Sequence, residues 1–224
     1  MRAQATRPRR IWPWILVALL VVSAIIAALT VTVWNRQDAQ PSASPTPTAT
    51  ESTTPDAEPT GCLGGTTRDA AMVLAAQEAA PHSSNGAIEV ATAFVRWLNQ
   101  YPYPNETDIA AIEADGIASN APTKDLASFF AGGPNLSGGL VADNTDYYLS
   151  TLPGVYHLEA SAPDDVTASI GTALAIDGEL SPTLKGSITV TMKWEGGSWK
   201  FVSSEGTRST EELYSIGQPF SGGC

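Results

Sequence analysis

The chain has few residues of the kinds that bind metals or act as nucleophiles and bases. It has only two histidines, His82 and His157, and two cysteines among its 224 residues. It has no nucleophile elbow, glycine-rich phosphate loop or metalloprotease motif. A zinc site needs three or four converging ligands, which these scattered residues do not supply. We therefore expect no metal, no cofactor, no catalytic residue and no enzyme activity.

Positive charge is also scarce. The chain has 12 Lys and Arg against 23 Asp and Glu, which gives a net charge of −11. All of the acidic residues follow residue 37. Because an acidic surface repels phosphate backbones, we expect no nucleic-acid partner.

One long apolar stretch, Ile11–Trp34, contains no charged residue. A membrane-spanning helix needs about 20 such residues, so we predict a transmembrane helix through which the protein contacts the membrane. Arginines in residues 1–10 indicate a cytoplasmic N-terminus, with the rest of this single-pass membrane protein outside the cell. The alternative is a cleaved signal peptide, but its apolar core is about 7–15 residues long. The greater length favours a retained anchor.

The stretch 35–61 is rich in Pro, Ser and Thr and nearly lacks large apolar residues. Such a composition cannot bury enough surface to fold and is typical of a disordered linker. Residues 62–224 then form one extracytoplasmic domain.

The two cysteines, Cys62 and Cys224, bracket this domain. Because disulfides persist outside the cytoplasm, we expect them to pair. Closing so long a loop would stabilise the fold by about 5 kcal/mol in the chain-entropy model. The alternative is two free thiols.

The first half of the domain has helical patterns. The apolar residues of 86–100 recur at helical spacing, whereas Glu89, Arg96 and Asn99 are expected to face away from the core. Side chains near Ser83 can cap this helix. Three further helices are expected: 68–79, capped by Thr66 or Thr67; 106–114, capped by Asn105; and one beginning at Thr123.

The second half alternates apolar and polar residues, as half-buried antiparallel strands do. The expected strands are 146–150, 155–160, 166–176, 184–194 and 198–204. The pair Gly196-Gly197 fits a two-residue hairpin turn that places Trp194 opposite Trp199 and Met192 opposite Phe201. Ser209 is expected to cap a last helix, 210–216. Helices followed by a curved antiparallel sheet predict an α+β domain.

Helices followed by long strands and the hairpin WEGGSWKFV (Trp194–Val202) resemble the nuclear transport factor 2-like superfamily over residues 62–205. That resemblance implies a cone-shaped sheet closed over the N-terminal helices. When the short tail and the single anchor are included, the order of segments resembles that of the bitopic inner-membrane scaffold proteins of type IV secretion and conjugation systems. This resemblance implies protein–protein assembly without catalysis. Gram-negative members have an Asn-Pro-x-Gly turn, whereas this chain has Gly133-Pro134-Asn135, and its linker suits a Gram-positive envelope better.

The leading hypothesis is therefore an assembly or scaffold module that binds other envelope proteins or itself. The candidate interaction residues are aromatic: Trp97, Trp199, Phe201, Tyr147 and Tyr148. Packing in the core explains the same residues equally well. The alternatives are a small-ligand-binding or sensing domain of the envelope and, less favoured, a cleft enzyme of the same fold. A closed apolar cone would favour the scaffold, and a roomy cavity with polar side chains would favour the alternatives.

Overall fold

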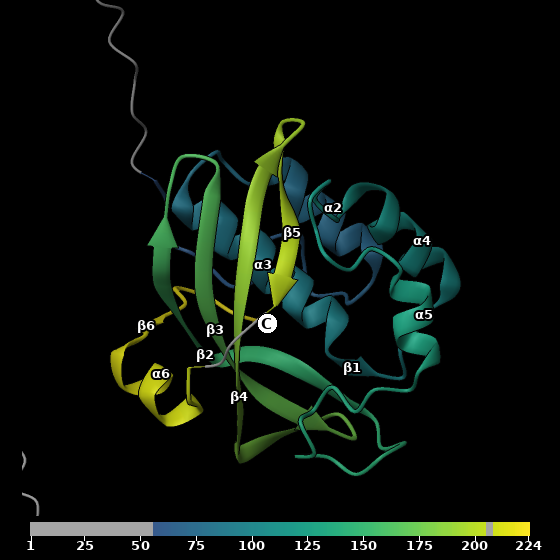
Figure 1. The fold of residues 1–224 in the computed structure, drawn as a ribbon. Coiled ribbons are helices and arrows are strands. Elements are labelled where there is room, and N and C mark those ends of the chain that lie inside the picture. The colour runs from purple at the N-terminus through teal and green to yellow at the C-terminus, as the bar shows by residue number, and fades with distance from the viewer. Residues whose placement is uncertain (1–55, 205–207) are drawn as a thin grey trace, which may run out of the picture. The chain divides into compact units, whose positions relative to one another are not determined.

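The computed structural model describes residues 56–204 and 208–224, which comprise most of the expected extracytoplasmic domain (Figure 1). The expected tail, the apolar stretch Ile11–Trp34 and the linker up to residue 55 lie outside the described residues. Within the described ranges, no helix has both the length and the apolar composition that crossing a bilayer requires.

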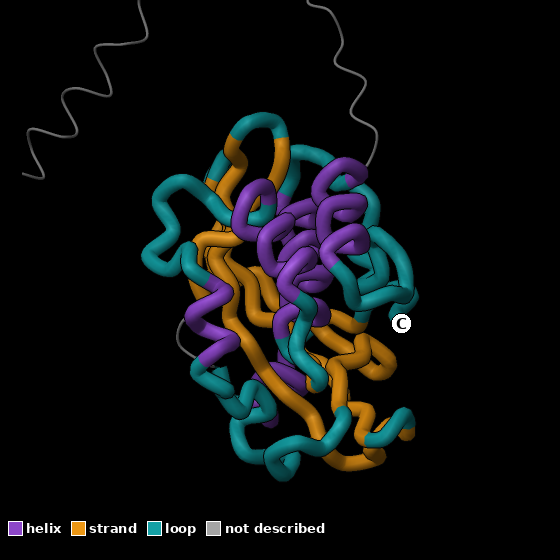
Figure 2. Tube along the Cα trace, turned by 90° about the vertical axis from the view of Figure 1, so that its right-hand side faces the viewer, coloured by secondary structure: helices purple, strands orange, loops and turns teal. Residues whose placement is uncertain are grey.

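A strongly curled antiparallel sheet has the strand order β1-β2-β3-β4-β5. The strands are β1 (Gln100–Tyr101), β2 (Tyr147–Ser161), β3 (Asp165–Ile176), β4 (Glu179–Glu195) and β5 (Ser198–Ser204), and β6 (Gln218–Pro219) pairs with β2. The helices are α2 (Ala70–Ala79), α3 (Ser84–Leu98), α4 (Glu106–Asp115), α5 (Leu126–Ala131) and α6 (Thr210–Ile216). The strands bend alongside and beneath the group of helices (Figure 2), which confirms the predicted α+β class.

Helix α3 is the centre of the domain, because it contacts β2, β3, β4 and β5. Its N-terminus is capped by Ser83, whose side chain accepts a hydrogen bond from the Gly86 amide, as expected. The prediction that the polar side chains of α3 face away from the core was wrong, however. Glu89, Arg96 and Asn99 are all buried. The chain that precedes α2 covers Glu89 and Arg96, whereas Asn99 donates to the carbonyl of Val95 within its own helix.

The other helices match the sequence pattern with shifted ends. Helix α2 begins later than expected and is capped by Asp69, not by Thr66 or Thr67. Helix α5 is capped by Asp125 and therefore does not begin at Thr123. The caps of α4 by Asn105 and of α6 by Ser209 are confirmed.

Strands β2 and β4 are longer than the sequence pattern predicts, whereas β5 has the predicted bounds. The two expected strands 146–150 and 155–160 form the single strand β2, whose pairing with β3 is interrupted between Ser150 and Val155. Strand β4 begins at Glu179 instead of residue 184. It follows β3 through Asp177 and Gly178, both of which have positive φ angles.

The β4–β5 hairpin is confirmed in detail. Trp194 pairs with Trp199 and Met192 with Phe201. Gly196 and Gly197 have φ angles of +65° and +90°, which the two-residue turn of a twisted hairpin requires. The hairpin closes the core, where the ring of Phe201 stacks on Phe94 with centroids 4.1 Å apart.

Residues 56–61, which the sequence pattern places in the linker, pack against the domain. The buried Pro59 accepts hydrogen bonds from the backbone and side chain of Ser221. The carboxylate of Glu89 accepts hydrogen bonds from the amides of Thr60 and Gly61, at 2.5 and 3.1 Å, and from the Thr60 hydroxyl. The buried carboxylate of α3 thus fixes the segment that leads into the domain.

Candidate functional site

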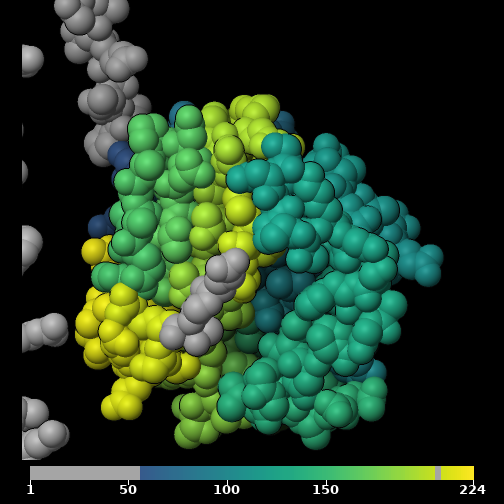
Figure 3. All heavy atoms as spheres, viewed as in Figure 1, coloured from purple at the N-terminus to yellow at the C-terminus, as the bar shows by residue number. Residues whose placement is uncertain are grey.

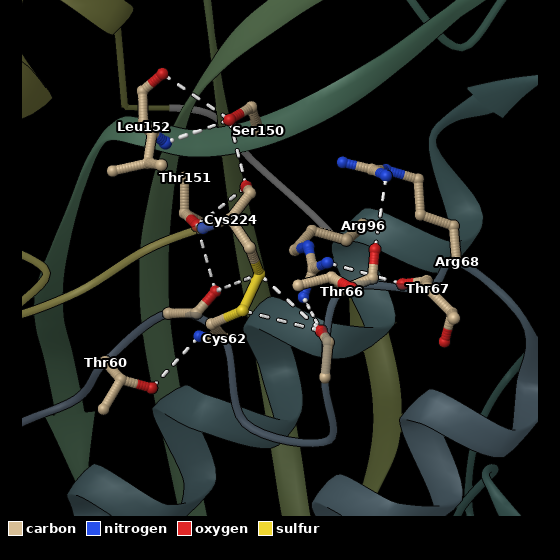
Figure 4. The surroundings of a disulfide bond; sticks show 12 residues. Thr60, Cys62, Thr66, Thr67, Arg68, Arg96, Ser150, Thr151, Leu152 and Cys224 are labelled. Carbon is tan, nitrogen blue, oxygen red and sulfur yellow. Dashed lines mark hydrogen bonds between the residues drawn. A yellow bond between two sulfur atoms is a disulfide. The ribbon is translucent and has the colours of Figure 1, made fainter.

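Cys62 and Cys224 form a disulfide bond, with their Cα atoms 5.6 Å apart (Figure 4). Thr151 of β2 fastens both sides of this bond. Its hydroxyl donates to the carbonyl of Gly61 at 3.0 Å and accepts from the amide of Cys224 at 2.8 Å. The expected pairing of the cysteines is therefore present, and it is typical of a domain outside the cytoplasm.

Arg96 extends from α3 toward the loop that follows Cys62 (Figure 4). Its guanidinium donates to the carbonyls of Gly65 and Thr67 at 3.1 and 3.4 Å. Burial, with a smaller effect from Arg68, lowers the pKa of Arg96 to about 10, and Glu89 opposes this shift. Arg96 therefore stays charged at neutral pH, and its contacts hold the loop beside the disulfide.

The candidate interaction residues lie mainly inside the domain. Trp97 and Trp199 are fully buried, and the indole N–H of Trp199 donates to the carbonyl of Pro81. Tyr147 and Phe201 are also buried, whereas Tyr148 is half-buried, with the guanidinium of Arg68 3.8 Å from its ring centre. The tryptophans are thus core residues, while Phe201 and Tyr147 each also line a surface cavity.

The two histidines lie apart. The ring of His82 stacks on Trp194 with centroids 4.2 Å apart, and its Nε2 lies 2.9 Å from a carboxylate oxygen of Asp164. His157 lies half-buried in β2. Neither histidine lines one of the cavities described here. Among the described residues, no group of three or more His, Cys, Asp or Glu side chains could hold a metal ion.

An open groove of about 390 Å³ lies between α3, α5 and the β4–β5 hairpin. Figure 3 shows this hollow between the yellow-green strands and the teal segment, with the dark blue of earlier residues at its base. None of the described residues that line it has a titratable side chain. We call it the apolar groove, and its main apolar residues are Phe94, Leu98, Leu126, Phe129, Leu136 and Ile188.

A second cavity of about 350 Å³ continues the apolar groove along β4, and the two share Leu136 and Ile188. Here the lining includes residues 185–188 of β4. Strand β5 pairs with β4 only from Val190 onward, so this part of β4 has no strand on that edge within the described ranges. An unpaired edge offers backbone donors and acceptors to an extended chain.

The fold and its cavities thus define a disulfide-bonded α+β domain with an apolar groove beside a part of β4 that, among the described residues, pairs with a strand on one edge only. Comparisons with protein-family models, curated proteins and solved structures find no match to this chain. The sequence pattern located the hairpin that forms one wall of the groove. It did not locate the groove itself, whose residues come from segments as distant as Phe94 and Ile188.

Proposed function

We propose that this domain is an extracytoplasmic assembly module, which binds an extended apolar segment of another envelope protein in the apolar groove. The observation that carries the proposal is the continuity of the groove with residues 185–188 of β4, whose second edge pairs with no strand among the described residues. A peptide lying there would add backbone hydrogen bonds along residues 185–188 and bury apolar side chains against Phe129 and Leu136. The proposal assigns no catalytic step to the domain.

Two further features support an assembly role. Among the described residues, the lining of the apolar groove has no charged side chain, which favours burial of the apolar side chains of a partner. The expected anchor Ile11–Trp34 would tether the domain to the cell membrane, within reach of other envelope proteins.

The arrangement of helices on a curled sheet is consistent with the nuclear transport factor 2-like fold. We propose this family on that basis, and with it the resemblance to scaffold proteins of type IV secretion and conjugation systems. Because one fold supports many unrelated functions, this resemblance is an argument about the fold, and the function is argued from the groove. Self-association through the same groove is the competing explanation, which the experiment below distinguishes from binding of another protein.

Photo-crosslinking in native membranes tests the proposal. A benzoylphenylalanine replaces Phe129 at the rim of the groove in the full chain, and in a matched control it replaces Leu158, an exposed residue of β2 that does not line the groove. We expect a crosslink from position 129, but not from 158, to one extended apolar segment of another protein. Adding Ile188→Asp should abolish this crosslink, because a charge would then lie in the groove.

Three outcomes would contradict the proposal. The first is the absence of any crosslink from either position. The second is a crosslink that survives Ile188→Asp, and the third is a crosslink only within the chain itself or to a second copy. The last would replace binding of another protein by intramolecular contact or self-association.

A further inference from the structure

Three tyrosines line a separate cavity of about 360 Å³ at the other end of the sheet from the β4–β5 turn. Tyr101 and Tyr103 follow α3, and Tyr147 begins β2. Pairing of β1 with β2 places Tyr101 directly beside Tyr147. The loop between α5 and β2 completes the wall with residues that include Pro134, Asn135, Asp143 and Asn144.

Two of the three phenol hydroxyls have partners inside the cavity wall. Tyr101 donates to the side-chain oxygen of Asn144 at 3.0 Å, and Tyr103 donates to the carbonyl of Pro134 at 2.7 Å. Only 6% of Tyr147 is exposed, and its buried hydroxyl has no hydrogen-bond partner among the described residues. Because a buried polar group without a partner is costly, this hydroxyl marks a place for a bound polar atom.

The charge of the cavity selects the sign of its ligand. Among the described residues that line the cavity, Asp143 alone is charged, and its carboxylate accepts one hydrogen bond from Asn135 at 2.7 Å. The described part of the chain contributes no Lys, Arg or His to the lining. Burial and the neighbouring Tyr103 raise the pKa of Tyr147 to about 12, so its phenol is neutral at physiological pH. Aromatic rings attract cations through their negative faces.

We propose that this cavity binds a small organic cation with a primary ammonium group, which pairs with Asp143, donates to the Tyr147 hydroxyl and lies among the tyrosine rings. An anion would be repelled by Asp143. A neutral polyol would satisfy Tyr147 but would leave the carboxylate without a counter-charge. The cavity shares no lining residue with the apolar groove, so this proposal and the assembly role stand or fall separately.

Nuclear magnetic resonance of the full chain in detergent, with ¹³C-labelled tyrosine rings, tests the proposal. The chain has six tyrosines. Three line the cavity, and Tyr148, Tyr156 and Tyr214 serve as internal controls. The probes are butylammonium and 1-butanol, which have nearly the same shape but differ in charge.

We expect butylammonium to shift the three cavity tyrosines saturably, to leave the other three unchanged, and to bind about tenfold more tightly than 1-butanol. Equal affinities for the two probes would overturn the proposal. So would an absence of saturable shifts, or shifts spread over all six rings.

Two variants with matched controls assign the roles of the residues. Asp143→Asn should weaken butylammonium binding about tenfold, whereas Asp146→Asn, outside the cavity, should not. Tyr147→Phe should weaken it about fivefold without lowering the stability of the fold, because it removes only an unpartnered hydroxyl. Tyr148→Phe, one residue along the strand, should have no effect. Unchanged binding in either cavity variant would overturn the proposed contacts.

Discussion

Arg96 is the largest charged side chain that is fully buried among the described residues. Its value to the fold depends on two backbone carbonyls, those of Gly65 and Thr67. We expect Arg96→Met, which retains most of the apolar stem, to lower the free energy of unfolding by about 2 kcal/mol, because both carbonyls lose a charged donor. Arg96→Ala should cost about 3 kcal/mol, since it also removes buried stem contacts. Urea denaturation measures both, and a methionine variant as stable as the wild type would show that these hydrogen bonds contribute nothing net.

Glu159 links the outer side of β2 to α6 through Arg208. The guanidinium of Arg208 donates to both carboxylate oxygens of Glu159, at 2.8 and 2.5 Å, and also pairs with Glu212. These hydrogen bonds lower the pKa of Glu159 from 4.5 to about 2, against the opposing effect of burial. The unfolded chain therefore binds the proton more tightly, so the stabilisation is complete above pH 4.5 and is lost as the pH falls toward 2.

We expect Glu159→Gln to lower the free energy of unfolding by about 1 kcal/mol at pH 7, since solvent screens a partly exposed pair. Glu212→Gln, which removes the other partner of Arg208, should cost less than about 0.5 kcal/mol. Urea denaturation from pH 7 to pH 2.5 checks the mechanism. The difference between wild type and Glu159→Gln should shrink below pH 4.5, and a constant difference would mean that ionisation of Glu159 is not its cause.

The residues that the sequence pattern misplaced are the polar ones of α3. Their helical spacing is that of a solvent-facing stripe, and periodicity alone cannot distinguish solvent from a covering chain segment. The partners of Glu89 and Arg96 are backbone groups of Thr60, Gly61, Gly65 and Thr67. No composition or spacing rule foresees such contacts across about 30 residues of sequence. The apolar groove and the tyrosine cavity were missed for the same reason.

At the scale of elements, local signals predicted turns and caps well. Ser83, Asn105 and Ser209 cap helices because each has a side-chain oxygen one turn before an apolar pattern. The turn at Asp177-Gly178 was overlooked, although Asp-Gly is a strong hairpin signal. Its recognition would have placed the start of β4 correctly. The continuity of β2 could not be foreseen, because Pro153 normally interrupts a strand, and here the break in pairing accommodates it.

The β4–β5 turn provides a test at this scale. A Cβ atom added at Gly196 or Gly197 would have no other atom within 4 Å, so the backbone conformation sets most of the cost. We expect Gly196→Asn to change the free energy of unfolding by less than about 0.5 kcal/mol, because Asn-Gly is favoured in such turns. Gly197→Val should cost about 1–2 kcal/mol, because a β-branched residue is strained at positive φ. Urea denaturation measures both, and equal costs would contradict the turn geometry.

At the scale of the whole domain, the disulfide joins two ends that other contacts also hold. The segment 57–61 is bound by Glu89 and by Ser221, and Cys224 is bound by Thr151. Because these contacts do not involve sulfur, we expect the domain to remain folded after reduction. The bond closes a loop of 162 residues, so its main effect is to restrict the unfolded chain.

We therefore expect the double variant Cys62→Ser with Cys224→Ser to lower the free energy of unfolding by about 3–5 kcal/mol while leaving the circular dichroism of the folded state unchanged. Alkylation of the wild type under denaturing conditions should add mass only after reduction.

Hydrogen exchange separates two explanations for any lost stability. If the bond acts on the unfolded chain, amide protection in the variant falls by the same free energy in α3 and β3, where exchange requires global unfolding. If the bond instead holds the ends in place, protection falls selectively at Thr151, Ser221 and Cys224, whose amides donate the hydrogen bonds of that corner. Loss of protection confined to those amides would contradict the entropic account.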